Sequence, residues 1–87
     1  MPGIAYTRHA DEKFEVLKRH GFEVTRAQVE ATIRAPDRVI SQAGGRVLVQ
    51  KRITERHVLR VIYRHEGEDQ VVITFYPGRR EQYETEL

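Results

Sequence analysis

The spacing of apolar residues changes once along this chain, after Pro36, and this change limits the folds that the chain can adopt. Before the proline, apolar residues recur every three or four positions, which is typical of an amphipathic helix. After it they alternate with polar residues, which is typical of strands with one buried side. No internal repeat and no Ser/Pro-rich linker divides the 87 residues, 39% of them apolar, so one hydrophobic core is predicted. The predicted fold class is therefore α+β, in a single domain over residues 1–87.

Two helices are predicted in the first part of the chain. The first spans Arg8–His20, between Thr7 as its N-cap and Gly21 as its stop. The second begins with a capping box made by Thr25 and Gln28 and ends before the proline. Both helices carry one apolar face, so each is expected to pack against the rest of the domain.

Four strands are predicted after the helices, over residues 38–42, 46–53, 58–66 and 70–76. Gly44-Gly45 suits the positive φ angles of a tight turn between the first two. Pro77-Gly78 is predicted to end the last strand. Strands that follow one another through short connections pair as an antiparallel meander. The predicted architecture is thus two N-terminal helices packed on one face of a four-stranded antiparallel meander sheet.

Alternation along the last two strands separates the two faces of this sheet. One face is predicted to carry Leu59, Val61, Tyr63, Val71, Ile73 and Phe75, and the other Arg60, Ile62, Arg64, Val72, Thr74 and Tyr76. The first face is apolar and can receive both helices. The second carries Arg, Thr and Tyr side chains, and it is left open for function.

Several classes of site are excluded by what the sequence lacks. Without cysteine, the chain has no disulfide framework, thiolate zinc site, iron–sulfur cluster or cysteine nucleophile. The four histidines show no metal-ligand spacing and Gly44-Gly45 lacks the Walker pattern, so neither a metal nor a cofactor is expected. No apolar run approaches the roughly 20 residues of a membrane span and Met1-Pro2-Gly3-Ile4 does not begin a signal peptide, so we expect a cytoplasmic protein. The formal charge of +2 does not by itself indicate nucleic-acid binding.

Motifs spread over nearly the whole chain resemble the DUF4258 family. They are His9-Ala10…Phe14, Val24…Val29-Glu30…Ile33…Pro36-Asp37-Arg38-Val39, Gln50-Lys51-Arg52, Leu59-Arg60-Val61-Ile62-Tyr63 and Val72-Ile73-Thr74-Phe75-Tyr76-Pro77. This family is similar to the RelE/ParE and BrnT toxin superfamily, whose folds place two helices before a curved antiparallel sheet. Members of that superfamily include ribosome-dependent messenger-RNA endonucleases and gyrase poisons.

The resemblance implies that polar residues of the sheet and the tail carry the function. The implied catalytic residues are Arg60, Tyr76, Arg79, Lys51 and His9, and the implied substrate-binding residues are Arg52, Arg64, Arg80 and Tyr83. Metal-free RNA cleavage needs groups that transfer protons and cations that stabilise the phosphate, for which His, Lys, Tyr and Arg are suited. Arginine binds phosphate through two parallel hydrogen bonds, and tyrosine stacks on a base.

The first hypothesis is therefore a toxin-like, metal-independent messenger-RNA endoribonuclease that acts with the ribosome. The second is a non-catalytic module that binds protein or RNA with the same face, and a weaker third is a gyrase inhibitor. Expected partners are RNA or the ribosome, an antitoxin protein or a second copy of this chain, and no membrane. A competing interpretation is that each arginine is an ordinary solvent-facing strand residue paired with a glutamate.

Overall fold

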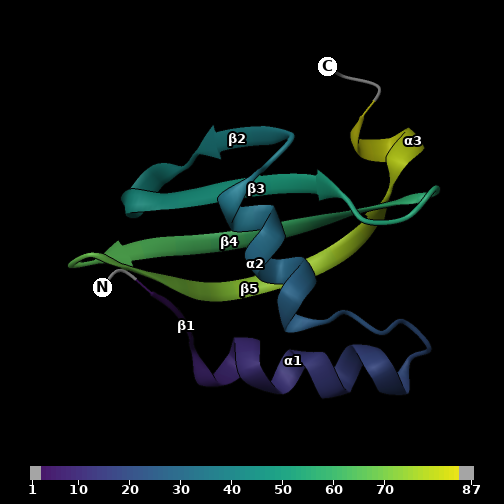
Figure 1. Ribbon diagram of the computed structural model, residues 1–87, viewed down its shortest axis with the longest axis horizontal. Coiled ribbons are helices and arrows are strands. Elements are labelled where there is room, and N and C mark those ends of the chain that lie inside the picture. The colour runs from purple at the N-terminus through teal and green to yellow at the C-terminus, as the bar shows by residue number, and fades with distance from the viewer. Residues whose placement is uncertain (1–2, 85–87) are drawn as a thin grey trace.

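The structure is a computed structural model that describes residues 3–84 (Figure 1). Its strands are β1 (Ile4–Tyr6), β2 (Arg38–Ser41), β3 (Arg46–Arg52), β4 (His57–Glu66) and β5 (Asp69–Arg79). Its helices are α1 (Arg8–Arg19), α2 (Arg26–Arg34) and α3 (Arg80–Tyr83), with a short 3-10 turn, η1 (Ala43–Gly45), between β2 and β3. Within this part of the chain, no helix is long and apolar enough to cross a membrane.

The two predicted N-terminal helices are confirmed, together with the residues that delimit them, but a third helix that was not predicted, α3, follows β5. The side chain of Thr7 accepts a hydrogen bond from the first turn of α1, and Gly21 follows that helix with a φ of 84°. Thr25 and Gln28 form the reciprocal capping box at the start of α2. These caps satisfy N–H groups that a helix leaves without a partner at its N-terminus, which explains why local sequence specifies where each helix begins.

The sheet has five strands rather than the four predicted, in the order β1-β5-β4-β3-β2. Strands β2 to β5 form the predicted antiparallel meander, and Gly44 and Gly45 have positive φ angles in the connection between β2 and β3. The additional strand, β1, pairs in parallel with β5, with Tyr6 opposite Val72. Three residues are too few to show an alternation, and a partner 66 positions away leaves no local signal.

The prediction that Pro77-Gly78 ends the last strand is wrong. Strand β5 continues to Arg79, and Pro77 and Gly78 lie opposite Leu59 and Val58 of β4. A proline is tolerated in a strand where no neighbour needs its missing N–H. Because β1 pairs only with residues 70–72, β5 is an edge strand at Pro77.

The predicted division of β5 into two faces is wrong for Val72, which was assigned to the polar face, and for Val71, which was assigned to the apolar face but lies opposite Arg64. A β-bulge changes the register of β4 and β5, so that Ile62 lies opposite Thr74 while Tyr63 lies opposite Val72. The extra residue, Ile73, shifts the alternation by one position. Val72 therefore joins Phe75 in the core, and both are fully buried.

The core lies between α2 and one face of the sheet, and α1 closes it at the edge beside β5 (Figure 1). Its buried members are Ala10, Val24, Val29, Ile33, Val49, Leu59, Val61, Tyr63, Val72 and Phe75. Phe14 of α1 packs on Phe75, with 4.6 Å between the ring centroids. The helices therefore do not lie side by side on one face, because α1 follows the edge of the sheet. The face opposite α2 is called the open face below.

Candidate functional site

The middle of the open face is formed by three cross-strand neighbours. Arg60 of β4 lies opposite Gln50 of β3 on one side and Tyr76 of β5 on the other. The residues on either side of Arg60 in the chain, Leu59 and Val61, are fully buried in the core. Alternation along β4 thus places Arg60 on the open face, as the sequence predicts.

Two tyrosines surround the guanidinium group of Arg60. Its Nη1 atom donates a hydrogen bond to the hydroxyl group of Tyr76, with 3.2 Å between the heavy atoms. The ring of Tyr83, which comes from α3, lies against the guanidinium, 4.3 Å from its central carbon to the ring centroid. Tyr83 also packs on Gly78, where the absence of a Cβ leaves space for the ring. The predicted residues Arg60, Tyr76 and Tyr83 therefore contact one another.

Two polar atoms beside this contact are buried without a partner. Gln50 is 1% exposed, and neither its Oε1 atom nor the Nε atom of Arg60 has a hydrogen-bond partner within the described residues. Oε1 accepts hydrogen bonds and Nε donates one. Unpaired buried polar atoms are uncommon in folded proteins and call for an explanation such as a bound water or ligand.

Helix α1 adds two basic side chains to the same region. The Nζ atom of Lys13 donates a hydrogen bond to Oγ1 of Thr74 at 3.2 Å, and Nε2 of His9 lies 3.3 Å from the same oxygen. The Lys13 ammonium also lies 5.7 Å from the centroid of the Tyr76 ring. Burial lowers the pKa of Lys13 below the ordinary lysine value.

We refer to His9, Lys13, Arg60, Thr74, Tyr76 and Tyr83 together as the Arg60 cluster. Sequence analysis placed His9 among the candidates but missed Lys13. The sequence feature that could have indicated Lys13 is its spacing of four residues from His9, which puts both side chains on one side of a helix. This spacing cannot show that the side of α1 in question meets β5, because Lys13 and Thr74 are 61 positions apart in the chain.

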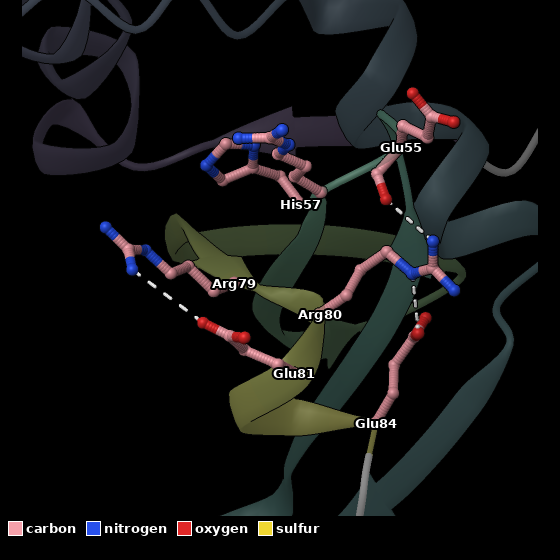
Figure 2. A pocket seen from close by; sticks show the side chains of 7 residues that line it. Glu55, His57, Arg79, Arg80, Glu81 and Glu84 are labelled. Atoms are coloured by element: carbon pink, nitrogen blue, oxygen red, sulfur yellow. Dashed lines mark hydrogen bonds and ion pairs between the residues drawn. The ribbon is translucent and has the colours of Figure 1, made fainter.

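A groove lies next to the Arg60 cluster, at the end of the sheet where β4 begins and β5 leads into α3 (Figure 2). Its volume is about 690 Å³, and it is lined by Glu55, Arg56, His57, Arg79, Arg80, Glu81 and Glu84. Figure 2 shows Arg80 pointing toward Glu84, while Arg79 points away toward Glu81. The lining mixes both signs of charge, so the groove does not by itself identify a ligand.

One carboxylate in this groove binds two of the predicted arginines. Glu84 accepts a hydrogen bond from Nε of Arg80 at 2.7 Å and one from Nη2 of Arg52 at 3.2 Å. Arg80 also donates to the backbone carbonyl of Glu55 at 2.6 Å. The bonds from Arg80 first, and from Arg52 second, lower the pKa of Glu84. Arg52 and Arg80 thus come together around a single anionic group.

The remaining predicted residues lie apart from the Arg60 cluster. Lys51 alternates onto the α2 side, where its Nζ atom donates to the carbonyl of Ala35 at the C-terminus of that helix, at 2.8 Å. Arg64 lies two positions beyond Ile62 on the open face and pairs with Glu66. Arg79 forms a 3.7 Å ion pair with Glu81 on the protein surface. Among residues 3–84, no three His, Asp or Glu side chains gather in a way that suits a metal ion.

Comparison with known proteins places this chain within a known fold. No family model matches the sequence, so the resemblance to DUF4258 stays a prediction, and no curated protein matches it. Among solved structures, the crystal structure of the Brucella abortus ribonuclease toxin BrnT is similar, with a TM-score of 0.59. The similarity covers 90% of this chain and 97% of BrnT at 17% sequence identity. This chain therefore has a fold similar to that of BrnT, a ribonuclease toxin.

Proposed function

We propose that this protein is a toxin-like endoribonuclease that cuts messenger RNA on the ribosome without a metal, and that RNA binds across the Arg60 cluster. The observation that carries the proposal is the Arg60 cluster itself. It brings together a guanidinium, a partly buried ammonium, an imidazole and two phenol rings from four separate elements on one face of the sheet. The similarity to the fold of a ribonuclease toxin supports the same class of function.

The cluster contains a group for each step of metal-free RNA cleavage. A neutral Lys13 amine takes the proton from a ribose 2′-hydroxyl, and the 2′-oxygen then attacks the adjacent phosphorus. Arg60 stabilises the additional negative charge on the phosphate oxygens. His9, as the general acid, donates a proton to the departing 5′-oxygen. The products are a 2′,3′-cyclic phosphate and a 5′-hydroxyl end, so atoms and protons balance without water or metal.

The other residues of the open face suit the binding of a single strand. Tyr76 offers a ring face on which a base stacks. Arg52 and Arg80 converge on one anionic group, which is the geometry that binds a phosphate. Lys51 is left out of the proposed site because it binds α2 on the other side of the sheet.

The alternative function, a non-catalytic module that binds RNA or protein, is favoured by a specific observation. Four of the predicted arginines already form ion pairs with glutamates of this chain; they are Arg52, Arg64, Arg79 and Arg80. Arginines that are neutralised internally bind phosphate more weakly than free ones. A surface of alternating charges also suits a protein partner such as an antitoxin.

Induced expression in a bacterial host, with growth and messenger-RNA ends followed in parallel, tests the proposal. Wild-type protein is expected to arrest growth and to produce new, translation-dependent RNA ends in primer extension. Lys13→Ala is expected to lose both effects, whereas Lys18→Ala, an exposed lysine on the same helix, should retain them.

Two other results would contradict the proposal. Growth arrest without RNA cleavage would indicate another target, such as gyrase. Normal growth with intact messages, from protein shown to be folded, would indicate the binding module.

A further inference from the structure

The C-terminal turn covers part of the face to which RNA is assigned. Tyr83 of α3 lies on Arg60, and Glu84, the next residue, binds Arg52 and Arg80. We infer that α3 and Glu84 occupy a nucleotide-binding site, with the Tyr83 ring in the place of a base and the Glu84 carboxylate in the place of a phosphate. We call α3 together with Glu84 the tail. The tail then competes with single-stranded RNA for the same site. This inference rests on the proposed function.

The phosphate half of the site is formed by two arginines from different elements. Arg52 ends β3 and Arg80 begins α3, yet both donate to the same Glu84 carboxylate, Arg52 through two nitrogens at 3.2 and 3.4 Å. Two guanidinium groups that share one carboxylate present several donors to an anion, as in arginine sites for phosphate. The Glu84 side chain is 21% exposed, so an incoming phosphate can reach this position from solvent.

The base half of the site lies beside it. The Tyr83 ring lies against the Arg60 guanidinium, which is an arrangement that a nucleobase also adopts with arginine. Gln50 adjoins Arg60 in the strand register, and Arg52 lies two residues further along β3 on the same face. A stacked base and its phosphate thus fit the same neighbouring positions that Tyr83 and Glu84 now fill.

Two buried polar atoms next to the tail lack hydrogen bonds while the tail fills the site. Oε1 of Gln50 and Nε of Arg60 have no partner within residues 3–84 while Tyr83 is in place. Tyr83 does not bond either atom, whereas the edge of a nucleobase carries several donors and acceptors. Replacement of Tyr83 by a base can therefore satisfy atoms that the tail leaves unpaired.

Release of the tail exposes little apolar surface. Helix α3 is a single turn of four residues and contains no buried residue. Arg80, its first residue, is held by hydrogen bonds to the carbonyls of Arg56 and Glu55. Beyond Arg80, its contacts with the sheet include the Tyr83 ring on Gly78 and Arg60 and the hydrogen bonds of Glu84. Because the contacts beyond Arg80 come from two side chains, those of Tyr83 and Glu84, a strand of RNA can replace them without unfolding the sheet.

The test measures the affinity of purified full-length protein for a fluorescent, 2′-O-methylated oligouridine, which stacks and carries phosphates but cannot be cleaved. Glu84→Gln is expected to bind this probe about tenfold more tightly than wild type, because the competing charge is removed. The slope of log affinity against log salt should steepen by about 0.7, the value for one additional single-strand phosphate contact. Glu81→Gln is the matched control, since it removes the same charge from an exposed pair on the same turn.

A double variant shows whether the gain arises at the predicted site. Adding Arg52→Ala to Glu84→Gln should abolish the gain, because Arg52 is one of the two arginines that donate to the anion at this position. Thermal melting of each variant verifies that it is folded.

The inference is overturned if Glu84→Gln binds no more tightly than Glu81→Gln, or if its gain survives the loss of Arg52. If wild-type protein still cleaves or binds RNA in that case, the proposed function stands without this inference. If no variant binds the probe, both fail.

Discussion

Partial burial lowers the pKa of Lys13, the proposed general base. Its pKa lies below the ordinary lysine value of 10.5, and an amine accepts a proton only when it is neutral. The rate of RNA cleavage should therefore rise with the fraction of neutral Lys13 below pH 10.5, and fall where the general acid of the proposed mechanism loses its proton. Lys13→Arg, whose side chain stays protonated, should remove this rise and lower the rate by roughly 100-fold or more. Single-turnover cleavage of a labelled RNA across pH checks both effects.

The matched control for this prediction is Lys18→Arg, on an exposed position of the same helix. It should leave the pH profile unchanged. If Lys13→Arg keeps the alkaline rise, the base is another group, and His9 is the next candidate because it contacts the same threonine hydroxyl.

Gly78 is a single residue on which the position of the tail depends. A Cβ added there would overlap the Tyr83 ring, so Gly78→Ala should displace Tyr83 from the open face. Because the added Cβ meets only the Tyr83 ring, and α3 contains no buried residue, the cost in stability should stay below about 1 kcal/mol. Trypsin should then cleave after Arg79 and Arg80 faster than in wild type, as followed by mass spectrometry.

Gly3→Ala provides the comparison, since a Cβ at Gly3 meets only Asp69 at an ordinary contact distance of 3.7 Å. Equal trypsin rates in both variants would show that Gly78 does not control the docking of α3.

At the scale of elements, α2 is the helix whose start is specified most completely. Thr25→Ala removes the side-chain half of its capping box and should lower the free energy of unfolding by about 1 kcal/mol. For a domain of this size, the melting temperature should fall by roughly 4–8 °C. Ser41→Ala, at an exposed strand end, should have a much smaller effect. A loss in Thr25→Ala no greater than in Ser41→Ala would contradict a stabilising role for the cap.

For the whole molecule, one face of the sheet forms the core and the open face is assigned to RNA. Mutations of two neighbouring residues of β4, one on each face, test this division. Val61 is fully buried under α2, so Val61→Ala should lower the free energy of unfolding by about 2 kcal/mol. Arg60→Ala removes a charge whose buried Nε has no hydrogen-bond partner among residues 3–84, so stability should change little while RNA binding and growth arrest are lost. Urea unfolding and the growth assay separate these outcomes. An Arg60→Ala variant that unfolds as readily as Val61→Ala would assign Arg60 to the core instead.

Features that depend on neighbours in the chain were predictable from the sequence alone. The caps at Thr7 and Thr25 and the turn at Gly44-Gly45 involve hydrogen bonds or φ angles within a few residues, so local residue types specify them. Alternation placed Arg60 and Tyr76 on one face because side chains of a strand point to opposite sides in turn. For the same reason the sequence indicated the α+β class and the meander.

Features that depend on distant residues were decided only by the tertiary structure. Three such features leave no periodic signal in any one segment. They are the pairing of β1 with β5, the bulge that places Val72 in the core, and the docking of Tyr83 on Arg60. Lys13 belongs to the candidate site because α1 runs along the edge of β5 and brings its side chain to Thr74. The spacing of four residues between His9 and Lys13 does not show that α1 lies beside this strand. Local patterns determine which elements form and which faces they bury, whereas long-range packing decides which polar side chains meet.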